Sequence, residues 1–287
     1  MRNALIAGFE TLFRYAAFMT VAAFVFPVVA FAQTAETGRT ESRIREAASS
    51  GGFYLRAGAL LDWSGETEFR DDGCSERHLY GCAASGKDGA PLRSVGDFET
   101  IYGLELGLGY DTPAPGLRLE AVFASRPDFS FEGNANYDIS DSDHPQPVSA
   151  DLSSLSGLCV AYLDLNELGV PRFGPFGAFI GGGVGFSRIV IGETRMEFPG
   201  RKTIVPGGRK FNLAWMLTAG SAVSLGKRMV LDVAWSYVDH GKVETGAGDG
   251  KVLSLDGGEC VVCPLPLVET DADLKSHGLR MSLRYML

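Results

Sequence analysis

The chain has 287 residues, of which 45% are hydrophobic, and it carries a formal net charge of −9 at pH 7. This acidity argues against nucleic acid as a partner, because nucleic-acid phosphates are bound by basic surfaces. A mean hydropathy of +0.06 is too low for a membrane protein built of apolar helices, although it is ordinary for a β-barrel with one apolar side.

Residues 1–32 have the form of a secretory signal peptide. Arg2 and Arg14 supply positive charge, and the apolar run that follows ends in Ala30-Phe31-Ala32, which fits an A-x-A cleavage site. Cleavage there makes Gln33 the first residue of the mature chain. The alternative is an uncleaved membrane anchor, because the run is about long enough to span a bilayer.

After the signal peptide the sequence predicts two parts. Residues 33–51 form a polar lead-in on the periplasmic side. Residues 52–287 form a single domain with no repeat beyond its predicted hairpins.

Within that domain, apolar and polar residues alternate with a period of two in eight segments. Around a helix Tyr102, Leu104 and Leu106 would scatter over the whole surface, whereas along a strand they form one stripe. Each segment has about ten residues, the length that a tilted transmembrane strand needs. The segments are residues 53–63, 102–110, 117–124, 155–165, 176–188, 211–224, 229–239 and 274–287.

Short and long connections alternate between these segments. Short turns in the periplasm and long loops outside are the asymmetry of outer-membrane barrels. The sequence therefore predicts an all-β fold, an eight-stranded antiparallel up-and-down transmembrane β-barrel with short periplasmic turns and four long extracellular loops. The short connections are residues 111–116, 166–174 and 225–228, and the long ones are 64–97, 127–151, 189–209 and 240–273.

The last segment indicates which side of the barrel faces outward. Leu279, Met281 and Leu283 alternate there with Arg280 and Arg284, almost to the end of the chain. A soluble sheet would turn its apolar side inward. Because the chain begins with an export signal, we instead expect the apolar side to face lipid and the arginines to face a polar interior, which places the exported protein in a bacterial outer membrane.

The polar sides of the predicted strands bring nine charged residues into the lumen. An eight-stranded barrel is just wide enough for side chains to fill it, and unpaired buried charges are costly, so we interpret the nine as an ion-pair network. The alternative is a narrow gated pore or an acid–base site. The nine residues are Arg56, Asp62, Glu105, Arg118, Glu120, Arg126, Asp232, Arg280 and Arg284.

Aromatic residues near the predicted strand ends fit the girdles that mark the two membrane interfaces. The alternative is ordinary core aromatics, which would not share a side with the leucines. The girdle residues are Trp63, Tyr102, Tyr110, Trp235 and Tyr237.

The cysteines form two close pairs and one single residue. Cys74 and Cys82 lie in one predicted loop and Cys260 and Cys263 in another, and close pairs in an exported chain indicate disulfides. A C-x-x-C also occurs in zinc and redox sites, but no second half-site or thioredoxin-like pattern accompanies this one. Cys159 is predicted to be an unpaired apolar residue within a strand. We expect no cofactor and no metal.

The predicted loops differ in the sign of their charge. The second and the last are acidic, whereas the third is basic. Either the loops are simply solvated and attract one another, or the basic loop binds lipopolysaccharide phosphates while the acidic loops bind divalent cations. The basic residues are Arg195, Arg201, Lys202, Arg209 and Lys210.

Three segments resemble the opacity-type, porin-like small outer-membrane β-barrel proteins. They are residues 175–188 (PFGAFIGGGVGFSR), 211–241 and 278–287. The resemblance covers the strands and not the loops, and it implies an eight-stranded outer-membrane barrel domain without implying a ligand. It also implies that the barrel-assembly machinery recognises the C-terminal residues Tyr285 and Leu287, although the family tends to end in phenylalanine.

Together these features predict a non-enzymatic surface protein that supports the envelope or binds a host or environmental ligand through its loops. Outer-membrane lipid, lipopolysaccharide and the assembly machinery are the other expected partners. The alternatives are a narrow porin-like channel for small solutes and a lipid A-modifying barrel enzyme. For the enzyme, Asp239 and His240 beside Ser236 are the candidate cluster, but the rise of a strand puts Ser236 roughly 13 Å from His240.

Overall fold

The computed structural model describes residues 51–287 except 72, 74–76, 82–84 and 140–143. The predicted signal peptide, its cleavage site and all but the last residue of the lead-in lie outside the described residues. Cys74 and Cys82 also lie outside them, so the bond between these two cysteines stays a prediction.

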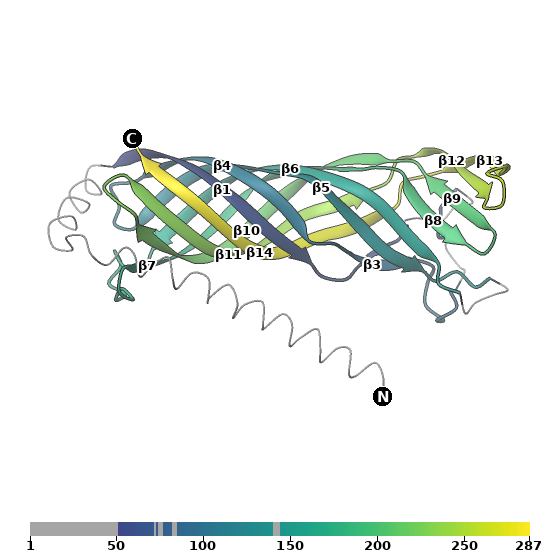
Figure 1. Cartoon of the computed structure of the whole chain (residues 1–287), viewed down its shortest axis with the longest axis horizontal. Helices are drawn as coiled ribbons and strands as arrows, with labels where there is room; N and C mark the ends of the chain where they lie inside the picture. Colours follow the sequence, from purple (N-terminus) through teal and green to yellow (C-terminus); the bar gives the residue numbers. More distant parts are fainter. Residues whose placement is uncertain (1–50, 72, 74–76, 82–84, 140–143) are drawn as a thin grey trace, which may run out of the picture. The chain divides into compact units, whose positions relative to one another are not determined.

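Eight long strands close into a ring (Figure 1), which confirms the predicted eight-stranded antiparallel barrel. Each strand pairs with its neighbours in the ring, and the last pairs with the first, so that no edge of the ring is left open. The ring consists of β1 (Gly52–Ser64), β4 (Ile101–Asp111), β5 (Leu117–Ala135), β6 (Pro147–Asp164), β7 (Phe176–Ile191), β10 (Gly208–Ser224), β11 (Met229–Glu244) and β14 (Asp271–Met286).

Within the described residues, no helix has the length and apolar character needed to cross a membrane.

Six shorter strands lie at the end of the barrel that carries the long connections. The predicted loops were therefore too long, because much of each consists of these strands or of continued ring strands. In the belt strands the apolar residues lie on the outer face, whereas in most of these added segments they lie on the inner face. The alternation used for the prediction therefore stops where these segments begin. The added strands are β2 (Thr67–Phe69), β3 (Ser94–Phe98), β8 (Thr194–Phe198), β9 (Arg201–Val205), β12 (Gly248–Ser254) and β13 (Cys260–Leu267).

We divide the barrel into two regions. The belt region comprises residues 52–64, 101–111, 117–126, 154–164, 176–188, 211–224, 229–240 and 276–287. The extension comprises the described residues of 65–99, 127–153, 189–210 and 241–275.

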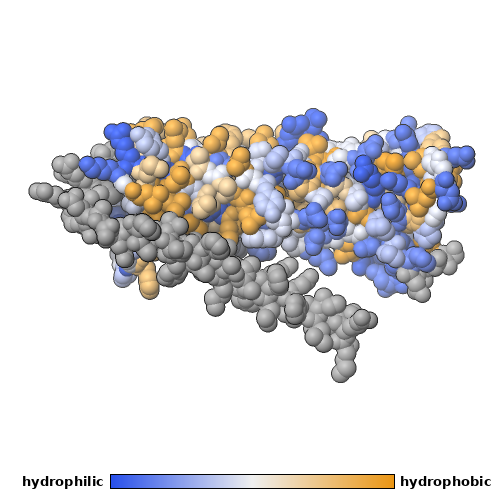
Figure 2. All heavy atoms as spheres, in the orientation of Figure 1, coloured by the Kyte–Doolittle hydropathy of each residue, from blue (hydrophilic) through white to orange (hydrophobic). Residues whose placement is uncertain are grey.

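The belt region is apolar outside and charged inside. Leu104 and Leu213 point outward with 68% and 78% of their surfaces exposed, whereas Arg56 and Glu105 point inward and are buried. Figure 2 shows the apolar residues gathered over the end of the barrel nearest the C-terminus. The belt region thus has the sidedness that the sequence predicts.

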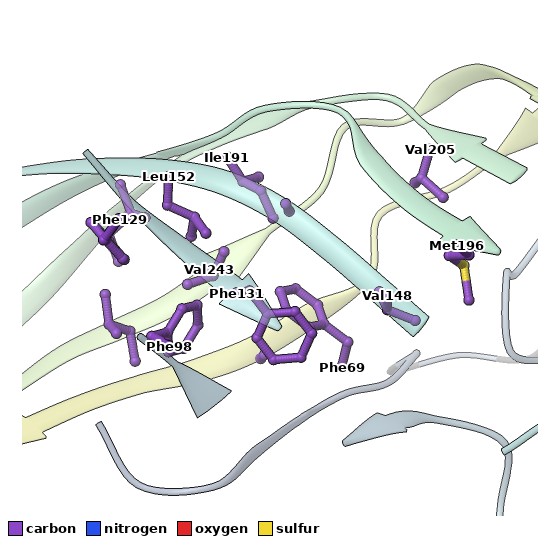
Figure 3. Packing of buried hydrophobic residues seen from close by; sticks show 14 of the residues in the cluster. Phe69, Phe98, Phe129, Phe131, Val148, Leu152, Ile191, Met196, Val205 and Val243 are labelled. Atoms are coloured by element: carbon purple, nitrogen blue, oxygen red, sulfur yellow. The ribbon is translucent and has the colours of Figure 1, made fainter. Parts of the chain in front are cut away.

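The extension has the reverse sidedness. Its interior holds a cluster of apolar residues, and Phe69, Phe98 and Phe131 point toward one another within it (Figure 3). The Phe131 ring centroid lies 4.9 Å from that of Phe69 and 5.5 Å from that of Phe98. Charged residues cover much of its outer surface, so the extension is built like a small water-soluble barrel.

Two β-bulges lie where the sidedness reverses. The register of β5 shifts between Arg126 and Phe129, so both side chains face inward although they are three positions apart, an offset that would put them on opposite faces of a regular strand. On β11 the register shifts between Asp239 and Lys242, and Gly241 adopts a φ of 82° there. In the other pairs of ring strands the register is constant, and the face that is apolar changes through the sequence alone.

Candidate functional site

The structure places all nine predicted lumen charges inside the belt region, and each is at most 6% exposed. They project from β1, β4, β5, β11 and β14, where alternate residues face the lumen. Every one of them has an oppositely charged partner within salt-bridge distance.

Glu105 is the centre of this network. Its Oε1 lies 2.5 Å from Nη2 of Arg56 and its Oε2 lies 2.8 Å from Nη1 of Arg280. Arg56 also contacts Glu120 at 2.9 Å and donates to the Tyr162 hydroxyl at 2.7 Å. One carboxylate therefore joins two arginines that come from β1 and β14.

Toward the short turns, two further arginines form two-point contacts with carboxylates. Arg284 donates to both oxygens of Asp232, at 2.6 and 3.0 Å. Arg118 donates to both oxygens of Asp164, at 2.8 and 3.0 Å. The sequence reasoning missed Asp164, because it stands at the end of its strand where the alternation gives no clear side.

Toward the extension, Arg126 and Asp62 form the last ion pair, at 2.7 Å. Just beyond it, Nε2 of His240 lies 3.2 Å from the Ser276 hydroxyl, and Ser187 donates to the His240 carbonyl. Nδ1 of His240 and Oδ1 of Asp62 are buried without a hydrogen-bond partner within the described part of the chain. This layer separates the charged lumen from the apolar interior of the extension.

The remaining wall of the lumen is mostly apolar. Met216, Val160 and Phe179 are buried there. Gly181 on β7 provides space, because a Cβ at that position would lie 2.7 Å from the Tyr162 ring. Side chains from all eight ring strands therefore fill the interior of the belt region.

The three candidate catalytic residues, Ser236, Asp239 and His240, hydrogen-bond to other residues and not to one another. The hydroxyl of Ser236 accepts from Nε of Arg280 at 2.9 Å, and His240 contacts Ser276 instead of Ser236. Asp239 accepts from the Gly241 amide. Across the described residues, no group of three His, Cys, Asp or Glu side chains is placed to hold a metal ion.

The predicted girdle residues lie on the outer surface of the belt region, and all but Trp235 lie near one of its two ends. Tyr110 packs on Phe53 with ring centroids 4.9 Å apart, at the short-turn end. At the other end, Tyr237 packs on Trp215 at 5.3 Å and Trp63 on His277 at 6.2 Å. Tyr102 and Trp235 also face outward, as do Tyr285 and Leu287 at the C-terminus.

Three cysteines lie among the described residues. Cys260 and Cys263 form a disulfide at the start of β13. Cys159 is a free thiol on the outer face of β6, where it is exposed. It therefore belongs to the apolar exterior of the belt region.

The predicted basic loop is a strand pair with charges on its outer face. Lys210 pairs with Glu244 of β11, and Lys202 lies 4.0 Å from Glu197. The contact between Lys210 and Glu244 joins the basic third loop to the acidic last loop. This agrees with the interpretation that loops of opposite charge attract one another. The remaining arginines are exposed and have no carboxylate within 4.0 Å in the described part of the chain: Arg195, Arg201 and Arg209.

A cavity of about 540 Å³ opens at the outer end of the extension. Its lining includes Met196, Phe198, Val252 and Leu265. Tyr137 also lines it, packs edge-on against Phe198 and donates to a backbone carbonyl, and burial raises the pKa of its hydroxyl. The tyrosine is therefore a neutral, structural part of the cavity wall.

No family model matches the sequence, and no curated protein matches it. Among solved structures, the barrel is similar to Neisserial surface protein A (NspA), with 12% identity over 82% of this chain and 97% of that chain and a TM-score of 0.38. It is also similar to the outer membrane protease OmpT from Escherichia coli, with 8% identity, the same coverage and a TM-score of 0.45. The attachment invasion locus protein Ail of Yersinia pestis matches with 10% identity over 80% of this chain and 99% of that chain, at a TM-score of 0.31. At such low identities and TM-scores these likenesses carry no conclusion about this chain.

Proposed function

We propose that this protein is a non-enzymatic, non-conducting barrel of a bacterial outer membrane that displays its extension on the cell surface. The observation that carries the proposal is the apolar exterior of the belt region around a buried ion-pair network. In water, each exposed Å² of apolar surface costs roughly 25 cal/mol relative to burial. Leucines as exposed as Leu104 and Leu213 are therefore expected against lipid and not against water.

The orientation follows from the same argument. The extension has a charged exterior and an apolar core, so it suits water outside the membrane, while the short turns suit the periplasm. Outer-membrane lipid and lipopolysaccharide would then surround the belt region. The extension would meet any host or environmental ligand.

Protease accessibility on whole cells tests location and orientation together. A protease site is inserted between Pro199 and Gly200, in the exposed turn between β8 and β9, and a matched site is inserted at Gly226 between β10 and β11. We expect cleavage of the first site on intact cells and of the second only after lysis. A mature chain that stays a folded monomer in buffer without detergent would contradict the proposal.

The filled lumen supports a structural role over transport. We expect no conductance steps when the purified protein is inserted in planar bilayers. Regular steps that change size in Glu105→Ala would instead favour the narrow channel. Likewise we expect unchanged lipid A masses on overexpression, and a new lipid A species would favour the enzyme.

The C-terminus supports assembly by the outer-membrane insertion machinery. Tyr285 is 45% exposed and Leu287 is 67% exposed, and both face the same side as the other lipid-facing residues. We expect Tyr285→Asp to reduce the amount of inserted barrel in cells, with Lys227→Gln, at an exposed position in the turn at the same end of the barrel, as a control.

A further inference from the structure

One arginine lies at the outer edge of the belt region among apolar side chains. Arg188 on β7 stands opposite Leu155 of β6 and Phe211 of β10, which are 49% and 66% exposed. Its guanidinium carbon lies 5.8 Å from the Phe211 ring centroid. Arg188 therefore extends along the apolar surface at the depth where lipid tails give way to headgroups.

This guanidinium has no counter-charge among the described residues. Nε of Arg188 is buried without a hydrogen-bond partner, and no carboxylate lies within 4.0 Å of the side chain in the described part of the chain. Asp151 and Glu193 form no ion pair with it. Glu244 pairs with Lys210 instead. A permanently charged group in such a place requires an anion from its surroundings.

A second arginine lies beside it. Arg209 on β10 is two residues from Phe211, the partner of Arg188, so the two arginines are diagonal neighbours on the same face, about 7–8 Å apart at Cα. Arg209 is exposed and also has no carboxylate partner among the described residues. Two guanidinium groups at this separation can reach the oxygens of one phosphate group.

Two other cations on the outer face of the barrel near this level have partners. Lys275 pairs with Asp273 at 2.7 Å, and Lys242 pairs with Asp271 at 2.8 Å. The outer wall of β3 and β5 is acidic, because Asp97 and Glu132 stand directly opposite one another in the sheet and both are exposed. At the edge of the belt region, unpaired positive charge therefore lies on the wall of β7 and β10, whereas Arg195 and Arg201, which also lack a carboxylate, lie farther out on β8 and β9.

From this geometry we infer that Arg188 and Arg209 form a site for the phosphate groups of lipids in the outer leaflet. The inference rests on the proposed outer-membrane location and adds the lipid chemistry and the wall that binds it. Arg188 contacts the phosphate from the apolar side and Arg209 from the aqueous side. Lys202 and Lys210 of the predicted basic loop do not contribute, because Glu197 and Glu244 already neutralise them.

The test compares lipids that differ in phosphate alone. The full mature chain, folded in neutral detergent, is mixed with lipopolysaccharide, with the same lipopolysaccharide after enzymatic removal of its phosphates, or with inorganic phosphate. Binding is measured by native mass spectrometry and by the shift of the unfolding temperature. The variants are Arg188→Gln/Arg209→Gln and, as the matched control, Lys275→Gln, which removes an exposed outer-face cation that already has a partner.

We expect the wild type and Lys275→Gln to bind phosphorylated lipopolysaccharide at least about tenfold more tightly than the double variant, the size expected for losing one or more charged hydrogen bonds. Removal of the phosphates should have the same effect on the wild type. Equal binding of both lipids, or undiminished binding by the double variant, would overturn the inference. Inorganic phosphate that binds as tightly as the lipid would also overturn it.

The outcome can be separated from that of the proposed function. A wild type that inserts into bilayers as a heat-modifiable barrel but ignores phosphate contradicts the phosphate site alone. A wild type that remains monomeric and folded in plain buffer contradicts the membrane location itself.

Discussion

The belt region and the extension use the same strands in opposite ways. In the belt region the ion pair of Arg56 and Glu105 is buried and Leu104 is exposed, whereas in the extension Phe131 is buried and the pair of Lys275 and Asp273 is exposed. A β-strand presents alternate residues to its two faces. If the apolar residues move from the outer face to the inner face, the outside of the barrel becomes suited to water instead of lipid. One continuous barrel thereby combines a lipid-facing part and a water-facing part.

This comparison predicts that substitutions in the two regions differ in both size and reach. A change in the charge network should affect the whole ring, because it joins strands that are far apart in sequence. A change in the apolar core of the extension should act locally.

We expect the largest effect from Glu105→Leu. It leaves Arg280 without its carboxylate and should reduce the free energy of unfolding by about 3–5 kcal/mol. The measurement is the loss of heat-modifiable gel mobility with temperature. Glu105→Gln keeps the volume and some hydrogen bonding, so its loss should be smaller. An unchanged melting temperature in both variants would show that the network does not hold the ring together.

Phe131→Ala should cost about 3–5 kcal/mol within the extension, because it removes a fully buried ring that contacts Phe69 and Phe98. We expect faster proteolysis of the extension with little change in the heat-modifiable mobility of the belt region. Leu104→Ala is the control, since it shortens an outward side chain and leaves no cavity. If the extension becomes susceptible to protease only at the temperature at which the belt region loses its heat-modifiable mobility, the two regions unfold as one cooperative unit.

Gly241→Ala tests the boundary between the regions. Its positive φ of 82° and a Cβ that would lie 2.5 Å from the Asn212 side chain predict a loss of about 1–3 kcal/mol. Gly226→Ala, where a Cβ would meet nothing within 4 Å, should be close to neutral in the same melting experiment. Equal stability of the two variants would mean that the bulge on β11 does not require glycine at position 241.

The smallest effect concerns pH and an exposed contact of the extension. A hydrogen bond from the Asn136 side chain, at 2.8 Å, lowers the pKa of Asp88 below its ordinary value. Because the folded-state pKa is the lower one, this contact stabilises the fold above the unfolded-state pKa and is lost as pH falls through the folded-state pKa. The Arg93 amide donates to Asn136, and its protection from hydrogen exchange, measured relative to an unprotected amide at the same pH, should therefore decrease at low pH. The same pH dependence in Asp88→Asn would assign it to another group.

Much of the belt region could be predicted from the sequence, because its alternation is strict. The stripe of Leu279, Met281 and Leu283 opposite Arg280 and Arg284 gives both the strand and its two faces. The extension could not be predicted in the same way. Beyond Arg126 the bulge changes which residues face inward, so counting by twos assigns Phe129 to the wrong face.

The candidate phosphate site illustrates the same limit. The sequence places Arg209 in a basic segment and Arg188 in a strand. It does not show that Arg188 lies among apolar side chains on the outer face. What joins the two is the register of β7 with β10, which sets Arg188 opposite Phe211. Of the five basic residues of the predicted loop, Lys202 and Lys210 have carboxylate partners, and the other three remain available to an anion.

The sequence by itself determined the number of ring strands, their order and the polarity of each face in the belt region, because these depend on local periodicity. The tertiary structure decided which charges meet, where the faces exchange polarity and which arginines lack a partner. Those properties depend on register, bulges and contacts between strands that are distant in the chain, and no local pattern records them.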